Sequence, residues 1–302
     1  MKNKIRVKVP ATTSNLGAGF DVFGAALTLY NEFEVELVSN RGQAGIFIKG
    51  EGADKLPSDS GNFLYFIMQK IFKKFGEKRF NLNNLKISIS CNVPLSSGLG
   101  SSAAAIVGGA ALANSLCGSK MSDAEIAQFA TDIEGHPDNA FPAVFGGICL
   151  CYNEGGKTRF HKIPSPKLKL IIASPAFEIN TSQSRKKLPK EYKTADAVFN
   201  ISRAALLTAS LYSKNFELLR DAVEDKMHQP YRLKSISKSK EIFEAAMRAG
   251  AKGVFISGSG PSIAAFAESA DAVKTAEAMS QFWRKENILN KTFILDFDGK
   301  GM

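Results

Sequence analysis

Hydrophobic and polar positions alternate over the first part of the chain in the way that half-buried β-strands require. The alternation covers residues 4–9 and returns over residues 32–38, where apolar side chains stand between glutamates. Between residues 61 and 76 the apolar positions recur at helical spacing, and the segment stops at a glycine. Residues 86–90 form another short alternating segment. The first third of the chain is therefore predicted to consist of strands with one helix.

The middle of the chain carries two helix signals and one hairpin signal. Residues 103–116 are rich in alanine and apolar on most faces, which predicts a buried helix. Ser122 and Glu125 have the spacing of a capping box and open a second helix that runs toward Glu134. Asparagine and glycine at 153–156 predict a hairpin turn, and the prolines at 164–166 mark a domain boundary. We therefore expect two domains, residues 1–163 and 164–302.

The second half has a different order of elements. A strand at 168–173 is followed by helices near 195–211, 216–226 and 240–249. Two strands at 253–257 and 262–267 then flank a glycine-rich turn, and a helix at 270–283 and a strand at 292–297 complete the chain. Strands separated by helices in this way predict an α+β fold with helices packed on one sheet face.

Composition narrows the class of protein. The chain has 302 residues, of which 44% are hydrophobic and 23% charged, and these fractions exclude a disordered or fibrous protein. The longest uncharged apolar stretch, residues 103–113, is too short to span a membrane, and the N-terminus has no apolar signal core. The four cysteines fit no disulfide framework and are expected to be reduced and buried. We expect a cytoplasmic protein without a membrane partner.

The net charge of +10 raises the question of nucleic-acid binding. The basic residues are scattered and are not interleaved with aromatic residues, so a solvated basic surface explains them better. Such a surface also attracts an anionic nucleotide. We therefore expect no nucleic-acid partner.

The strongest candidate for chemistry is a glycine-rich segment, residues 94–103, between a strand and a helix. Gly98 and Gly100 let backbone N–H groups approach an anion, and the helix N-terminus adds its positive dipole end. The hydroxyls of Ser101 and Ser102 offer hard oxygen ligands for phosphate or Mg²⁺. The segment is not a Walker A loop, because no Gly-Lys-Ser/Thr follows. The alternative is a glycine-rich helix entry that binds no ligand.

Other polar residues gather at three further places. Residues 134–139 combine carboxylates, an amide and His136, as a Mg–nucleotide site requires, although a simple Asx turn explains the same pattern. His136 invites a general-base or zinc interpretation, but the histidines lack paired ligand spacing, which disfavours zinc. Residues 11–21 form either a surface loop or a substrate-facing loop. Arg185 and Arg232 are either surface charges or bidentate partners of a carboxylate.

Together these segments resemble the GHMP small-molecule kinases, and among them most closely the homoserine kinases. The resemblance rests on residues 9–21, 94–103, 134–147, 225–232 and 257–261 and spans nearly the whole chain. It implies a two-domain α+β fold, with an N-terminal domain like domain 2 of ribosomal protein S5 and a ferredoxin-like C-terminal α/β sandwich. The N-terminal domain would carry the phosphate loop, and the C-terminal domain would contribute a clamp on the substrate.

The resemblance also implies roles for single residues. Asn62 would face adenine, Ser102 and Glu134 would hold Mg²⁺, and Asn139, Ser102 and Glu134 would be the catalytic residues. The phosphates of ATP would be bound by the loop residues Pro94, Ser97, Gly98, Leu99, Gly100, Ser101 and Ser102. The substrate would be bound by Asn15, Asp21 and Asp138 at its ammonium group, Asn139 at its hydroxyl, Arg185 and Arg232 at its carboxylate, and by Gly260.

The activity that the resemblance implies is transfer of the ATP γ-phosphoryl group to the side-chain hydroxyl of L-homoserine, giving O-phospho-L-homoserine for threonine biosynthesis. The expected assembly is a homodimer. Two alternatives stay open: a GHMP kinase acting on mevalonate or shikimate, and a non-catalytic regulator that binds nucleotide. The absence of a lysine at positions 12–14 weighs against mevalonate kinase.

Overall fold

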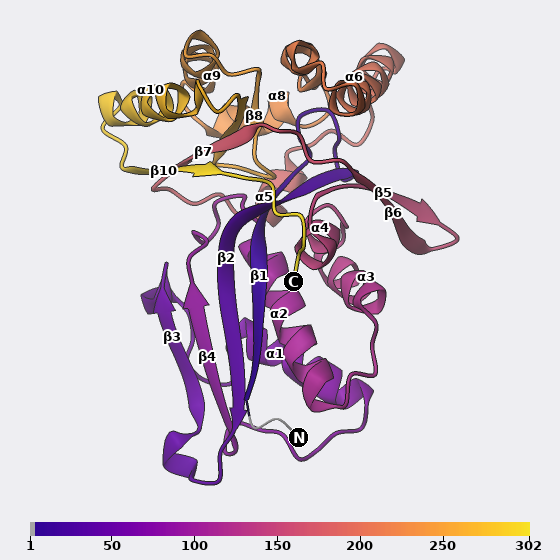
Figure 1. Cartoon of the computed structure of the whole chain (residues 1–302), viewed down its shortest axis with the longest axis vertical. Helices are drawn as coiled ribbons and strands as arrows, with labels where there is room; N and C mark the ends of the chain where they lie inside the picture. The colour runs from indigo at the N-terminus through magenta and orange to yellow at the C-terminus, as the bar shows by residue number, and fades with distance from the viewer. Residues whose placement is uncertain (1–3) are drawn as a thin grey trace.

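The computed structural model describes residues 4–302 and contains two β-sheets, each packed against helices (Figure 1). The first sheet has the order β3-β4-β2-β5-β6, with β1 paired to the other edge of β2. Its strands are β1 (Lys4–Ser14), β2 (Phe23–Leu37), β3 (Gly45–Gly50), β4 (Leu85–Cys91), β5 (Ile148–Glu154) and β6 (Lys157–Ile163). The helices of this half are α1 (Phe63–Lys74), α2 (Ser101–Leu116), α3 (Asp123–Glu134) and α4 (Ala140–Phe145).

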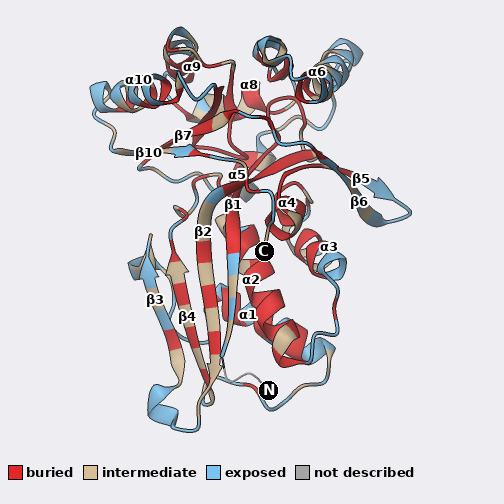
Figure 2. Cartoon of the chain, viewed as in Figure 1, coloured by how far each residue is buried: buried red, intermediate tan, exposed pale blue. Residues whose placement is uncertain are grey.

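The second sheet is antiparallel, with the order β10-β7-β9-β8. Its strands are β7 (Lys169–Pro175), β8 (Gly253–Ile256), β9 (Ile263–Ala267) and β10 (Asn290–Leu295). The helices of this half are α5 (Thr181–Lys186), α6 (Thr194–Ser213), α7 (Leu219–Ala222), α8 (Gln229–Arg232), α9 (Ser239–Arg248) and α10 (Ala272–Lys285). Figure 2 shows exposed outward faces on the outer helices α6, α9 and α10. Of the strands of the second sheet, β7, β8 and β9 are buried, and β10 is only partly buried.

The central helix α2 explains how the first half is held together. Alanines and glycines on α2 allow close approach to the sheet, and a Cβ on Gly108 would lie 2.3 Å from the Phe33 ring of β2. The helix is buried on most faces, as its sequence predicts, and packs against β1, β2 and α1. The capping box of α3 is also confirmed, because Ser122 accepts from the Glu125 amide while Glu125 accepts from the Ser122 amide.

The two halves meet where β1 ends and where the chain turns between β8 and β9. The Thr13 and Ser257 hydroxyls lie 2.9 Å apart, and the Gly258 amide donates to the Ser14 carbonyl. The C-terminal segment returns to the first half, where Phe297 bridges to Leu27 of β2 (Figure 1). Loops from both halves are therefore fixed at one common edge.

The α+β class is confirmed, but two local predictions are wrong. Residues 11–14 are not loop: they continue β1 and are buried, because their hydroxyls find partners inside the protein. The predicted helix at 216–226 is helical only through Ala222, since the Asp225 carboxylate draws the following backbone amides into a turn. Strand β3 was not predicted.

The four cysteines are buried and unpaired, as predicted. Burial raises the pKa of the Cys149 thiol to about 12. Within residues 4–302, no helix combines the length and the apolar character needed to cross a membrane.

Candidate functional site

The glycine-rich loop before α2 has a conformation that only glycine tolerates. Gly98 and Gly100 adopt φ angles of +80° and +68°. A Cβ on Gly98 would lie 2.2 Å from the Ser257 carbonyl oxygen, and one on Gly100 would lie 1.9 Å from Thr12 Oγ1. Gly100 is the N-cap of α2, and as a glycine it offers no side chain to cap the first-turn amides of this helix. These amides and the helix dipole make the loop a ready anion site.

Ser102 and Glu134 lie at neighbouring helix ends and point toward each other. Ser102 Oγ, in the first turn of α2, donates to Glu134 Oε1, at the end of α3, over 2.5 Å. Sequence analysis assigned both residues to one Mg²⁺ site, and the fold places their oxygens together. A hydroxyl and a carboxylate are hard oxygen donors of the kind that Mg²⁺ prefers.

Asn139 is held in place by the end of β1. Thr12 Oγ1 donates to Asn139 Oδ1 over 2.8 Å, and Asn139 Nδ2 donates to Ser14 Oγ over 3.3 Å. All three side chains are buried. Local sequence could not reveal this arrangement, because the partners are more than 120 residues apart. Thr12 and Ser14 thus orient the amide that sequence analysis placed at the reacting hydroxyl.

An acidic corner lies beside Asn139. His136 Nδ1 and Asp138 Oδ1 are 2.6 Å apart, and His136 Nε2 lies 3.8 Å from Glu134 Oε2. Burial alone would lower the pKa of His136, but the hydrogen bond to Asp138 and the charges of Asp138, Glu134 and Asp21 raise it above the usual value. Ligand atoms of Asp21, His136 and Asp138 lie within 4.8 Å of one another. The corner therefore favours a positive charge.

The two arginines come from the second half of the chain. Arg185, near the end of α5, donates Nη1 and Nη2 to the Asp21 carboxylate over 2.9 and 2.7 Å, a bidentate pair. Arg232, at the end of α8, is 3% exposed and donates Nη1 to the Gly258 carbonyl over 2.9 Å. Burial and the nearby Arg185 charge lower the pKa of Arg232. Its Nε is buried and has no hydrogen-bond partner among the described residues.

A pocket of about 330 Å³ joins these groups. Of the predicted residues it is lined by Asn15, Asp21, Ser97, Gly98, Gly100, Ser101, Ser102, Glu134, Asp138, Asn139, Arg185 and Arg232. The remaining predicted residues do not line it. Gly260 and Leu99 are buried behind it, Pro94 lines a neighbouring groove, and Asn62 lines an adjoining pocket of about 260 Å³. The Asn62 side chain caps α1 and donates to the Pro57 carbonyl.

Sequence analysis missed several residues that line this pocket. They are Ser14, Ser96, Ile179, Asn180, Ser182, Gly258 and Ser259. Ser14 and Ser96 lie inside the polar segments 11–21 and 94–103. Their nearness in sequence to the predicted residues Asn15 and Ser97 was the signal that could have identified them. Asn180 caps α5, and nothing local indicates that this short helix reaches the pocket.

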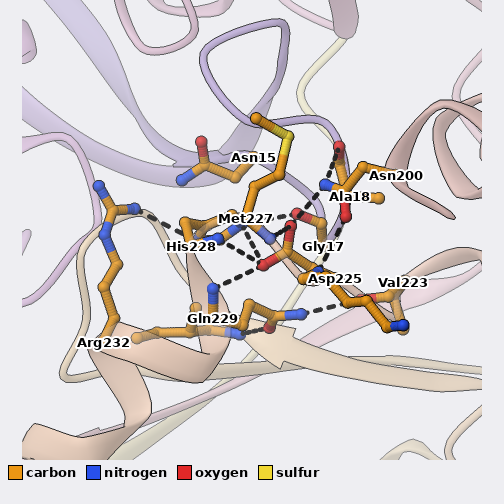
Figure 3. A network of polar contacts seen from close by, with 12 residues as sticks. Asn15, Gly17, Ala18, Asn200, Val223, Asp225, Met227, His228, Gln229 and Arg232 are labelled. Carbon is orange, nitrogen blue, oxygen red and sulfur yellow. Dashed lines mark hydrogen bonds and ion pairs between the residues drawn. The ribbon is translucent and has the colours of Figure 1, made fainter. Parts of the chain in front are cut away.

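A buried network behind the pocket ties α8 to the first half of the chain (Figure 3). The Asp225 carboxylate accepts from Asn200 Nδ2 and from the amides of His228 and Gln229, at 2.6 to 2.8 Å. His228 Nε2 lies 2.7 Å from the Gly17 carbonyl oxygen, and Gln229 Nε2 donates to the Val223 carbonyl. The network fixes the helix that carries Arg232.

Comparisons with known proteins agree on one family. Residues 62–147 match the family model described as GHMP kinases N terminal domain, and residues 207–285 match GHMP kinases C terminal. A homoserine kinase of Clostridium kluyveri is 43% identical over 264 residues, covering 87% of this chain and 86% of that protein. A homoserine kinase of Trichormus variabilis is 41% identical over 300 residues, covering 99% and 98%.

Solved structures give the same result. The crystal structure of homoserine kinase from Cytophaga hutchinsonii superposes with a TM-score of 0.86 at 30% identity, covering 100% of this chain and 97% of that one. The L. major mevalonate kinase in complex with R-mevalonate has a TM-score of 0.74 at 16% identity, covering 100% and 99%. The second likeness is one of fold alone.

Proposed function

Since this chain belongs to the GHMP kinase family, and within it to the homoserine kinases, we propose that it transfers the γ-phosphoryl group of ATP to the side-chain hydroxyl of L-homoserine. The product is O-phospho-L-homoserine, an intermediate of threonine biosynthesis. Membership in this family confirms the predicted α+β fold class and makes the protein an enzyme whose phosphoryl donor is ATP.

The observation that carries the proposal is the charge pattern of the pocket. Carboxylates and guanidinium groups line one wall, and an uncapped helix N-terminus lines another. An amino-acid zwitterion matches the first wall, because its ammonium group pairs with Asp21 and Asp138 while its carboxylate pairs with Arg185 and Arg232. The triphosphate of ATP matches the loop from Gly98 to Ser102. Mevalonate and shikimate carry no ammonium group for the acidic corner.

Magnesium fits the pair formed by Ser102 and Glu134. Their two oxygens already converge, and both are of the chemical kind that the ion prefers. When bound, the ion would neutralise charge on the phosphates of ATP. The hydrogen bond between the two side chains keeps their oxygens 2.5 Å apart, so both would be available to the ion.

Positioning supplies most of the catalysis in this proposal. The amide of Asn139 contacts the substrate hydroxyl, and Thr12 and Ser14 hold that amide in a fixed orientation. His136 Nδ1 is paired with Asp138, and the surrounding carboxylates raise the pKa of His136 above its usual value. The proposal uses no dedicated general base: the hydroxyl proton passes to a phosphate oxygen, which a loose transition state permits.

The adjoining pocket is the proposed adenine site. It opens beside Ser101 and Ser102 and is lined by apolar side chains that include Leu56, Phe63 and Leu95. Asn62 lines this pocket while its Oδ1 caps α1 and its Nδ2 donates to the Pro57 carbonyl, and the proposal keeps it as the residue that faces adenine. We further propose that the enzyme works in the cytoplasm as a homodimer, and its four unpaired cysteines support a reducing compartment.

The test is ADP release, measured with a coupled assay on a panel of L-homoserine, L-threonine, mevalonate and shikimate. We expect turnover with L-homoserine and none with mevalonate or shikimate. Turnover of mevalonate in preference to L-homoserine would overturn the proposal, and so would ATP binding without turnover of any alcohol. In Arg232→Leu, the KM for homoserine should rise about 10- to 150-fold while the KM for ATP stays unchanged, since a charged hydrogen bond is worth about 1.5–3 kcal/mol.

A further inference from the structure

His228 is a buried titratable residue that the chemistry above does not use. Its ring is fully buried, and Nε2 lies 2.7 Å from the Gly17 carbonyl oxygen. A carbonyl only accepts hydrogen bonds, so Nε2 carries the ring proton and Nδ1 keeps its lone pair. That lone pair faces Arg232 Nη1 at 3.4 Å, as Figure 3 shows. The hydrogen bond to Gly17 thus selects the tautomer that Arg232 requires.

The surroundings of the ring keep it neutral. Burial lowers the pKa of His228, and the Arg232 charge lowers it further, against the opposing charge of Asp225. A proton on Nδ1 would point at the guanidinium of Arg232. The face of His228 also stacks on Phe20, with the ring centroids 5.3 Å apart and the planes at 23°.

These contacts determine which edge of Arg232 is left for a ligand. Nη1 is occupied, since it donates to Gly258 and faces His228. The Phe20 ring lies 5.2 Å from the guanidinium carbon. Nε, on another edge, is buried without a partner in the described part of the chain, and Arg232 lines the pocket. The guanidinium is therefore held through Nη1, while Nε keeps an N–H group that no residue in the described part of the chain satisfies.

We infer that His228 is a positioning residue for carboxylate recognition. It holds Nη1 of Arg232 against Gly258 so that the remaining N–H groups of the guanidinium meet the substrate carboxylate in the pocket. The inference rests on the proposed function, in which that carboxylate belongs to L-homoserine. Sequence analysis did not assign a role to His228.

The test compares kcat/KM for L-homoserine with kcat/KM for 3-amino-1-propanol, which is homoserine without its carboxylate. In His228→Gln, the side-chain amide replaces Nε2 as donor to Gly17 but offers Arg232 no acceptor in the place of Nδ1. The preference for homoserine should fall about 5- to 10-fold, with an unchanged KM for ATP, as expected for loss of one weak charge-assisted hydrogen bond. If His228 had a purely structural role, its replacement would lower kcat/KM equally for both substrates. An unchanged preference for homoserine therefore overturns the inference.

Two further variants complete the test. His228→Asn keeps an acceptor near the position of Nδ1 but loses the donor to Gly17, so it should melt earlier than His228→Gln and retain more of the preference. Adding His228→Gln to Arg232→Leu should cause no further loss of preference, because His228 acts through Arg232; a full additional loss contradicts this. Failure of the wild-type chain to phosphorylate homoserine contradicts the proposed function itself, whereas normal turnover with unchanged preference in His228→Gln contradicts only the role of His228.

Discussion

Replacing Gly100 by alanine tests whether the phosphate loop is shaped by its glycines. Gly100 has φ +68°, and the new Cβ would lie 1.9 Å from Thr12 Oγ1 and 3.2 Å from Asn139 Oδ1. The first distance is far below any real contact, so Thr12 or the loop must move. Movement of Thr12 breaks its hydrogen bond to Asn139, and movement of the loop breaks the hydrogen bond from the Thr12 amide to the Leu99 carbonyl. The substitution thus disturbs the substrate amide in the first case and the anion site in the second.

The magnitude follows from two separate contributions. Alanine in the left-handed region costs about 1–2 kcal/mol relative to glycine. Loss of one buried hydrogen bond of Thr12, to Asn139 or to Leu99, adds about 1–3 kcal/mol, because a buried acceptor loses its donor. We therefore expect the free energy of unfolding to fall by about 2–5 kcal/mol. Misplacement of the reacting groups by about 1 Å lowers kcat by about 100-fold.

Gly118→Ala is the matched control. Gly118 has φ +86° at the end of the same helix, and a Cβ there would meet nothing within 4 Å. This variant measures the backbone cost alone and should leave kcat unchanged. Urea unfolding and coupled ADP release are measured on both variants. Equal stability of the two variants, with normal turnover by Gly100→Ala, would refute the reasoning.

Three further predictions concern the residues around this loop. Glu134→Gln keeps an acceptor for the Ser102 hydroxyl but removes the negative charge. We expect kcat to fall about 100-fold and the Mg²⁺ concentration needed for the half-maximal rate to rise. An unchanged dependence of the rate on Mg²⁺ concentration contradicts the metal assignment. Thr12→Val leaves Asn139 Oδ1 without its donor, so it should cost about 1–3 kcal/mol of stability and lower kcat about tenfold. Thr12→Ser keeps the hydroxyl and should retain both the stability and the kcat of the wild type. Equal stability and equal kcat in the two variants would argue against a role for this hydrogen bond. The pKa of His136 is higher in the folded protein than in the unfolded chain. Protonated His136 therefore stabilises the fold fully below the pKa of the unfolded state, and this contribution is lost as the pH rises through the higher pKa of the folded state. The stability difference between wild type and His136→Gln should therefore shrink as pH rises above 6.5 in thermal melts, and a difference that grows with pH contradicts the sign.

Elements with a strong local signal could be predicted from the sequence. The alanine-rich α2 and the capping box of α3 are examples, because their patterns lie within a few residues. The failures have a tertiary cause. Residues 11–14 are polar yet buried in β1, since Thr13 finds its partner in Ser257, 244 residues away. The helix predicted at 216–226 ends early, because the Asp225 carboxylate serves Asn200 and the amides of the next turn.

The candidate site shows the same division between local and tertiary information. Residue types and the family resemblance identified most of the pocket's charged groups, and the fold brings these into one place. Neither indicated that Asp21 and Arg185 pair directly across 164 positions, nor that Thr12 orients Asn139. Those pairings depend on the tertiary packing of the chain, which cannot be predicted from a local sequence pattern.

The central claim is that one pocket, built from both halves of the chain, binds the zwitterion and the triphosphate side by side. A crystal structure of the protein with Mg²⁺, a non-hydrolysable ATP analogue and L-homoserine tests it most directly. The account predicts the homoserine carboxylate on Arg185 and Arg232, its ammonium group at Asp21 and Asp138, and its hydroxyl between Asn139 and the γ-phosphate on the loop from Gly98 to Ser102. A homoserine molecule bound away from Arg232, or a triphosphate that avoids this loop, would contradict the account.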